Sequence, residues 1–412
     1  MKVCGIIAEY NPFHNGHLHH LQESIRLSQA DYTIVVMSGN FMQRGTPALM
    51  DKYERARAAL ECGADLVIEL PAYYATGSAE YFALGAVSLL DKLGVVTHLC
   101  FGSECGDLDF LSKVAEITSD ESSAYQKCLQ SHLRSGKSYP LARTAAIIEV
   151  SPELSASISC LSSPNNILGI EYIKALRGLN SSIMPITLKR CGSDYHDIRL
   201  GINQSSATAI RQALYNNVDL KELSAQMPEA SFEILSNYLR ENQPVFLRNF
   251  AEVLYYKLLT ERDNGFTDYI DVSQALSYRI CKNLYAFDGF EAFCDLLKTK
   301  EVTYSRISRC LFHILLDMRK EELNKYINEL DITPYVRILG FRKASTDLLK
   351  EMSNASKIPL ITKLADAQTF LSEGAYEMLK KEILINDIYS CIRASKNKKP
   401  MTNEYSTPIV IV

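Results

Sequence analysis

Four of the eight histidines in this chain lie within seven residues, at His14, His17, His19 and His20. They follow an apolar run and a turn containing Gly16, the pattern of a strand that leads into a helix. At such a helix start, unpaired N–H groups and the helix dipole favour an anionic phosphate. His14 and His17 can both donate imidazole N–H groups to the charge that develops when an α-phosphorus is attacked. The alternative for each histidine is a cap or a surface side chain, which we expect for His19 and His20.

A second group of residues with related chemistry lies in the segment SSATAIR, residues 205–211. The hydroxyls of Ser206 and Thr208 at a helix start can bind phosphate oxygens, and Arg211 one turn later can offset the charge of pyrophosphate. Taken alone, such a start is more often a plain helix cap. Its significance comes from its pairing with the histidine turn.

The elements that position these two segments follow from the hydrophobic pattern. Apolar runs at 3–8, 33–37, 66–70, 98–102 and 183–188 alternate with amphipathic segments, which predicts a parallel sheet with crossover helices. Ligands of such sheets bind beyond the carboxyl ends of the strands, where the histidine turn lies. From Leu220 to about Ile392 the pattern is helical, and the β-branched end at 408–412 either adds a strand or frays.

We therefore expect an α/β, Rossmann-like domain over residues 1–216, followed by an all-α domain over residues 217–412. The length of 412 residues fits two domains, and a composition of 47% hydrophobic and 22% charged residues is that of a globular protein. A net charge of −4 provides no global attraction for nucleic acid, so any RNA site must be a local patch. Two basic groups are candidates for such an RNA contact. The first is Arg337, Arg342 and Lys343, and the second is Lys396, Lys398 and Lys399.

The eleven cysteines include no CxxC pair, which argues against a disulfide framework and favours a reducing cytoplasm. Cys100 and Cys105 with His98 fit no standard zinc spacing, so we expect no metal site. No apolar stretch has the length of a signal peptide core or a membrane span. These observations predict a cytoplasmic protein without a membrane partner.

Both segments resemble motifs of a known superfamily. His14-Asn15-Gly16-His17 matches the HxGH signature of the nucleotidyltransferases, and SSATAIR resembles their second motif, ISSTxxR. The second match departs from the motif at Ser205 and Ala207. The resemblance implies that residues 1–216 form an ATP-binding nucleotidyltransferase-like catalytic domain, with His14, His17 and Arg211 as catalytic residues.

A closer resemblance is to the bacterial tRNA(Met) cytidine acetate ligases. It is carried by GIIAEYNPFHNGHLHHL from Gly5, FGSE from Phe101, SPNNILGIEY from Ser163 and LKR from Leu188. The resemblance implies that acetate attacks the α-phosphate of ATP, and that acetyl-adenylate then acetylates N4 of the wobble cytidine of elongator tRNA(Met). ATP is the implied cofactor with Mg²⁺ as its counterion, the helical half is the expected tRNA platform, and no obligate protein partner is inferred. The implied ATP-binding residues are Ile7, Ala8, Glu9, Tyr10, Asn11, Pro12, Phe13, His14, Asn15, Gly16, His17, Leu18, His19, His20, Gly102, Asn165, Arg190, Ser206 and Thr208.

Three of these positions suit ATP on their own chemistry. Gly102 ends a predicted strand and would let a nucleoside approach closely. Asn165 offers a donor and an acceptor for a base edge, with helix capping as the alternative, and Arg190 can bind phosphate, with a surface ion pair as the alternative. Two other functions stay open: a nucleotidyltransferase acting on a small phosphorylated metabolite, and a nucleotide-binding adaptor without catalysis.

Overall fold

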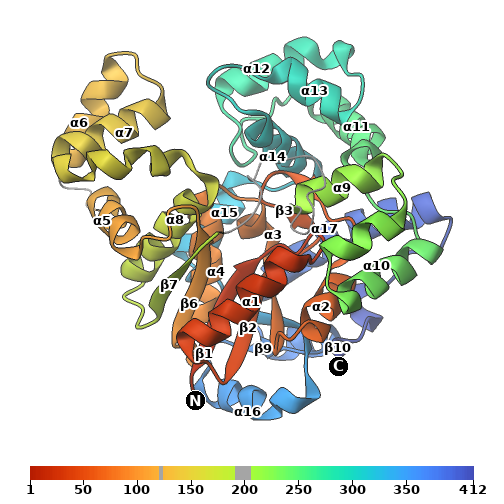
Figure 1. Ribbon diagram of the computed structural model, residues 1–412. Coiled ribbons are helices and arrows are strands. Elements are labelled where there is room, and N and C mark those ends of the chain that lie inside the picture. Colours follow the sequence, from red (N-terminus) through yellow and green to blue (C-terminus); the bar gives the residue numbers. More distant parts are fainter. Residues whose placement is uncertain (120–123, 191–205) are drawn as a thin grey trace.

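The sheet at the centre of the protein draws strands from both halves of the chain. The computed structural model describes residues 1–119, 124–190 and 206–412, so the motif position Ser205 lies outside the described residues. The strand order is β10-β8-β5-β2-β1-β6-β7, with β9 pairing with β8, and the strands β5, β2, β1, β6 and β7 are parallel (Figure 1). The expectation of an α/β fold built on a mainly parallel sheet is confirmed.

The elements of the first half alternate as the hydrophobic pattern predicts, with helices following strands. The strands are β1 (Val3–Ala8), β2 (Tyr32–Ser38), β5 (Leu66–Leu70), β6 (His98–Ser103) and β7 (Met184–Lys189), with a small hairpin of β3 (Phe41–Met42) and β4 (Thr46–Pro47). The helices are α1 (Asn15–Ser28), α2 (Lys52–Glu61), α3 (Ala72–Ala75), α4 (Ala79–Lys92), α5 (Leu108–Ser119), α6 (Ala124–Arg134), α7 (Tyr139–Val150), α8 (Pro164–Gly178) and α9 (Ala207–Tyr215).

The second half is mainly helical and surrounds the sheet. Its helices are α10 (Glu229–Glu241), α11 (Ala251–Glu261), α12 (Gln274–Asn283), α13 (Phe290–Leu297), α14 (Tyr304–Leu315), α15 (Lys320–Asn328), α16 (Thr346–Ala355) and α17 (Glu373–Asn397). Figure 1 shows α11 to α14 gathered at the top of the molecule, α9 and α10 at the right, and α6 and α7 as a lobe at the upper left. No helix in the described ranges is both long and apolar enough to cross a membrane.

Alternate residues of the central strands face two separate hydrophobic cores. Ile34 and Val36 of β2 join the core that holds α4 and α8, whereas Val35 and Met37 join the core that holds α1 and α2. All four side chains are fully buried, because a parallel sheet carries helices on both of its faces. This two-sided packing fixes the start of α1 at the carboxyl end of β1.

The expectation that residues 217–412 are all-α requires a correction. Three strands of this half, β8 (Val336–Phe341), β9 (Leu360–Ile361) and β10 (Val410–Ile411), enlarge the sheet, and β8 runs antiparallel to β5. The strand expected as one outcome at the C-terminal end is therefore present. A six-residue apolar run such as β8 can form either a strand or part of a buried helix. The partner that makes it a strand, β5, lies some 270 residues away in sequence. The functional boundary near residue 217 stays a prediction, since the sheet crosses it.

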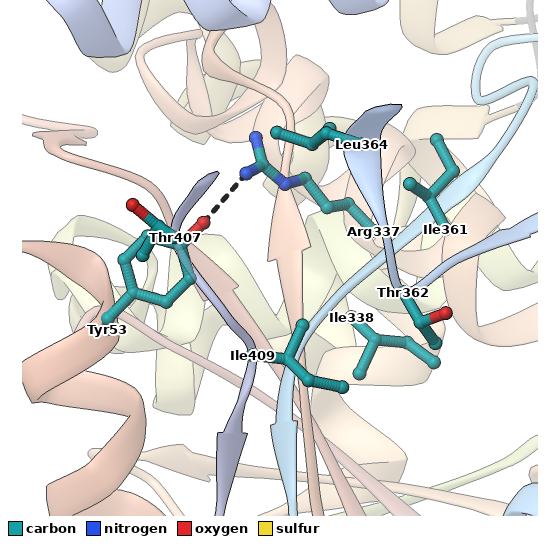
Figure 2. Close-up of a pocket in the computed structure, with 8 residues that line it drawn as sticks. All are labelled: Tyr53, Arg337, Ile338, Ile361, Thr362, Leu364, Thr407 and Ile409. Carbon is teal, nitrogen blue, oxygen red and sulfur yellow. Dashed lines mark hydrogen bonds between the residues drawn. The ribbon is translucent and has the colours of Figure 1, made fainter. Parts of the chain in front are cut away.

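A buried group of four charged side chains joins β8 and the C-terminal segment to the sheet. Lys52 Nζ lies 2.7 Å from Glu69 Oε2 and also pairs with Glu404, and Arg337 contacts Glu404 at 2.8 Å and Glu69 at 3.3 Å. Figure 2 shows Arg337 at a small cavity, where its Nη2 donates to the hydroxyl of Tyr53 at 2.8 Å. Arg337 is only 5% exposed and is neutralised by two carboxylates, so it is unavailable to RNA, which corrects its place among the candidate basic groups.

Candidate active site

The turn between β1 and α1 is held in place by the Asn11 side chain, which bonds to distant backbone groups, and by the packing of its own aromatic rings. The Asn11 side chain accepts from the N–H of Leu49 at 2.9 Å and donates to the carbonyl of Pro47 at 3.3 Å, and it is 2% exposed. The buried Tyr10 ring packs edge-on against the rings of Phe13 and His17, with centroid distances of 4.7 and 4.9 Å. Asn11, Tyr10 and Phe13 therefore shape the turn.

His14 and His17 form a close pair of tilted rings at the start of α1. Their ring centroids lie 3.8 Å apart with an interplanar angle of 32°. His14 Nδ1 accepts from the N–H of Gly16 at 3.0 Å, and His17 Nδ1 accepts from the N–H of His14 at 3.3 Å. In a neutral imidazole one nitrogen accepts and the other carries the proton, so this network assigns the proton of both rings to Nε2. The pair therefore offers two Nε2–H donors.

The surroundings of these rings keep them neutral. Burial, with the charges of Arg190 and Arg211 as smaller contributions, lowers the pKa of His14 to about 3. The pKa of His17 also lies well below its usual value, because of burial and its neighbours His14 and Arg190. At neutral pH the positive charge of the site therefore comes from the two arginines.

The depressed pKa of His14 gives a stability prediction. The unfolded chain gains a proton near pH 6.5, whereas folded His14 resists protonation down to about pH 3, so stability is complete above pH 6.5 and falls as the pH drops. We expect His14 to account for about 2 kcal/mol of lost unfolding free energy between pH 7 and pH 5. The comparison is urea denaturation of the wild type and His14→Asn, which keeps a cap but does not titrate in this range. Parallel pH profiles of the two proteins would contradict the prediction.

The structure changes the expected roles of the backbone and of Gly16. The N–H groups of His17 and Leu18 donate to the carbonyl of His14 at 2.8 and 3.1 Å, and the N–H of Gly16 is used by the His14 ring. These backbone groups are therefore already used, and the donors that this turn could offer to a phosphate are the imidazole groups. A Cβ on Gly16 would lie 2.9 Å from His14 Cε1, so glycine makes room for the ring.

The start of α9 meets the turn through Arg211. Its Nη1 donates to the carbonyl of Asn11 at 2.8 Å and its Nη2 to Thr208 Oγ1 at 3.0 Å. Ser206 Oγ accepts from the N–H of Ala209 at 3.1 Å and so caps the helix, which is the alternative role that the sequence offered for this motif. The structure thus brings two motifs that are about 190 residues apart in sequence to one place.

The ends of β6 and β7 form the other side of the site. The Arg190 side chain crosses Gly102, where a Cβ would meet Arg190 Cγ at 3.2 Å. The Arg190 N–H donates to the carbonyl of Ser103 at 2.9 Å, and its charge contributes to the low pKa of His14, His17 and His20. Gly102 therefore lets an exposed arginine lie between the strand ends and the histidines.

Glu104 clamps the end of β6 to the start of α8. Its Oε1 accepts from the N–H and the Nδ2 of Asn165 at 3.2 and 2.7 Å, and its Oε2 accepts from the N–H of Asn166 at 2.9 Å. In return, the fully buried Asn166 accepts through Oδ1 from the N–H groups of Glu104 and Cys105 at 2.9 and 3.2 Å. A carboxylate only accepts, so Asn165 must turn its Nδ2 to Glu104 and its Oδ1 away.

The remaining positions implied by the resemblance surround this centre or support it. Ile7 and Ala8 end β1, and Glu9 Oε1 accepts from the N–H of Gln43 at 2.8 Å. His19 is exposed, whereas the pKa of His20 falls to about 4 through burial and Arg190. Asn15 is tied to the second half of the chain, since its Nδ2 donates to the carbonyl of Ala225 at 2.8 Å.

Two supporting residues are absent from the sequence-based set of site residues. Glu104 lies in the FGSE motif, which could have indicated it, and Arg55 lies in helix α2 without any such signal. Arg55 is fully buried, and its guanidinium donates to the carbonyls of Glu9 at 2.7 Å and Ser38 at 3.1 Å. It thereby joins the ends of β1 and β2, a role that only the tertiary structure reveals.

Fold and site together define a class. β1 lies between β2, which follows it in the chain, and β6, which returns to its other side, so the strand order reverses beside the histidine turn. Ligands of open α/β sheets bind at such a reversal, and donors for phosphate gather there in this protein. This is the arrangement of a nucleotide-binding α/β enzyme with an HxGH turn.

Comparison with known proteins gives the family. The family model described as HIGH Nucleotidyl Transferase matches residues 1–404, and the chain belongs to this family. It is 40% identical over 411 residues to the tRNA(Met) cytidine acetate ligase of Caldanaerobacter subterraneus subsp. tengcongensis, and 41% identical over 411 residues to that of Thermoanaerobacter sp. strain X514. Both alignments cover 100% of each chain.

Two solved structures have the same fold over their whole length. The chain is similar to the apo form of Thermotoga maritima TmcAL, with a TM-score of 0.94 and 35% identity. It is also similar to Thermotoga maritima TmcAL bound with alpha-thio ATP, with a TM-score of 0.91 and 35% identity. Each match covers 100% of both chains.

Proposed function

We propose that this chain is an ATP-dependent ligase that acetylates the wobble cytidine of elongator tRNA(Met). The observation that carries the proposal is the close ring pair of His14 and His17, whose two Nε2–H groups lie at the start of α1 beside two arginines. Supporting it, relatives about 40% identical over the whole chain are named tRNA(Met) cytidine acetate ligase.

The first step joins acetate to the α-phosphorus of ATP. An acetate oxygen forms a bond to that phosphorus, the bond to the bridging oxygen of the leaving pyrophosphate breaks, and acetyl-adenylate results. His14 and His17 donate to phosphate oxygens as negative charge grows on them, and Arg211 neutralises the pyrophosphate. In the second step the N4 amine attacks the acetyl carbon, AMP leaves and the amine loses a proton.

These residues suit ATP better than a resident metal. Neutral imidazoles and guanidinium groups are donors for phosphate, whereas Mg²⁺ prefers oxygen ligands such as carboxylates. In the part of the chain that the structure describes, no group of three acidic, histidine or cysteine side chains could hold a metal ion. Mg²⁺ would therefore arrive with ATP as the counterion of its phosphates.

The test is exchange of labelled pyrophosphate into ATP with a panel of carboxylates, followed by mass analysis of nucleosides from treated tRNA. We expect exchange with acetate and the appearance of N4-acetylcytidine in elongator tRNA(Met). Exchange supported only by a phosphorylated metabolite would instead favour the nucleotidyltransferase alternative. ATP binding without any exchange would favour the adaptor alternative.

Asn165 gives a sharper prediction about the nucleoside. Because Nδ2 is held by Glu104, Oδ1 faces away from that carboxylate and is an acceptor, which suits an N–H or O–H group and repels phosphate oxygens. We propose that Oδ1 accepts from the nucleoside of ATP. The wild type should bind one of three triphosphates about 10-fold more weakly than ATP: the purine riboside that lacks the 6-amino group, 2′-deoxy-ATP or 3′-deoxy-ATP.

The Glu104→Gln variant tests this orientation. Its new glutamine amide can donate to Asn165, so the Asn165 side chain is free to rotate. The preference for ATP over the analogue that binds the wild type weakly should therefore shrink. Glu149→Gln is the matched control, since Glu149 of α7 is exposed and pairs with His132 of the neighbouring helix α6. Dissociation constants by calorimetry provide the comparison. Equal binding of ATP and all three analogues by the wild type would refute this role for Asn165.

A further inference from the structure

Helix α9 links the candidate active site to a cluster of cations and aromatic rings. Its first turn carries Ser206, Thr208 and Arg211, and its last residue is Tyr215. A helix of nine residues is about 13 Å long. Tyr215 therefore lies within reach of a substrate much larger than ATP that occupies the same site.

Four side chains make up this cluster, which we call the Tyr215 patch: Tyr215, Phe246, Arg248 and Lys396. The Tyr215 and Phe246 rings meet edge to face with centroids 5.2 Å apart. Arg248 Cζ lies 4.3 Å from the Tyr215 centroid, and Lys396 Nζ lies 5.3 Å from the Phe246 centroid. Residues from α9, from the segment before α11 and from the end of α17 thus converge.

The positive charge of the patch is not cancelled. Arg248 is exposed, and within the described residues no carboxylate lies at ion-pair distance from Arg248 or Lys396. Among the described residues, Lys396 Nζ donates to two neutral oxygens, the Pro244 carbonyl at 2.6 Å and Asn249 Oδ1 at 3.1 Å. Burial and the nearby Arg248 lower the pKa of Lys396 to about 8. A bound anion would offset the repulsion between the positive charges of Lys396 and Arg248.

The chemistry of the patch fits a nucleic acid backbone. A guanidinium stacked on a tyrosine ring is held in one plane, so its N–H groups can bind a phosphate in bidentate fashion. Tyr215 is 37% exposed and offers a face for an unpaired base. Lys398 and Lys399 follow at the end of α17 and extend the positive surface, although Lys399 is 3.5 Å from Glu241.

We infer that the Tyr215 patch binds the phosphate backbone of the tRNA substrate next to the modified cytidine. This inference rests on the proposed function and adds to it the surface on which the RNA lies. It assigns this contact to the C-terminal basic group that includes Lys396, and not to the buried Arg337. The patch lies at the opposite end of α9 from Ser206, Thr208 and Arg211, so we assign it to the second step alone.

The experiment measures tRNA binding and adenylation separately in the full-length protein. The variants are Arg248→Gln and the double variant Arg248→Gln/Lys396→Met. The control is Arg26→Gln, which removes the same charge from an exposed ion pair at the opposite end of α1. We expect the double variant to bind elongator tRNA(Met) about 10-fold more weakly. Its slope of log affinity against log salt should fall by about 1 to 2, with acetate-dependent pyrophosphate exchange unchanged.

The other possible outcomes would overturn either the inference about the patch or the proposed function. Unchanged tRNA affinity and salt slope in both patch variants would overturn the inference and leave the proposed function in place, as would an equal loss in Arg26→Gln. Because Lys396 also supports its neighbours, the exposed Arg248→Gln must by itself weaken binding. A wild-type protein that exchanges pyrophosphate but binds no tRNA would overturn the proposed function together with the patch.

Discussion

Replacing His17 by alanine should lower acetate-dependent pyrophosphate exchange by about 10²-fold or more while leaving the protein folded. The expected size is that of deleting a fixed donor to a developing oxyanion. The variant loses one of the two Nε2–H groups of the close histidine pair. We expect His14→Ala to lower exchange by a factor of the same order. The measurement is the exchange rate at saturating ATP and acetate.

Gln22→Ala is the matched control for this prediction. Gln22 lies on the same helix five residues later and is exposed, so its loss should leave exchange within about 2-fold of the wild type. Thermal unfolding of all variants separates folding from chemistry, since His17 also closes the cap of α1. Near-normal exchange in a folded His17→Ala would remove the histidine pair from the mechanism.

Arg211→Ala is the second substitution with a large expected effect. We expect adenylation to fall by about 10²-fold, because the variant loses the charged group that we assign to stabilising the leaving pyrophosphate. Arg211 also holds α9 to the turn through the Asn11 carbonyl, so binding of ATP should weaken as well. Affinity for tRNA should change much less, because the RNA contacts are assigned to the other end of α9.

Gln212→Ala provides the control, since Gln212 is the next residue of α9, is exposed and donates a hydrogen bond from its side chain to Asn216. Single-turnover adenylation and tRNA filter binding measure the two steps. An Arg211→Ala protein that forms acetyl-adenylate normally yet fails to bind tRNA would place this arginine on the RNA instead.

The same geometry explains why two interpretations of the histidine turn agree. Histidines at a helix start can be caps, and His14 and His17 do close a reciprocal cap on α1. The cap uses both Nδ1 atoms, which fixes the tautomer and leaves both Nε2–H groups for a ligand. Capping here orients the donors that chemistry needs.

Local patterns in the sequence were sufficient for the five parallel strands of the first half and for the two motifs, but they did not reveal the short hairpin of β3 and β4. The turn at His14 and the cap at Ser206 depend on residues within a few positions of each other, so their chemistry can be read along the chain. The all-α prediction for the second half missed β8, because its pairing with β5 depends on contacts between distant segments.

Tertiary structure alone decided which charges are available to a ligand. Arg337 and Arg248 look alike in sequence, yet one is buried between two glutamates and the other is exposed on a tyrosine ring. That the Asn165 oxygen faces away from Glu104 likewise follows from a partner about 60 residues away. Residue types and spacing determine which chemistry is present, whereas burial and partners from distant segments determine which groups remain free to perform it.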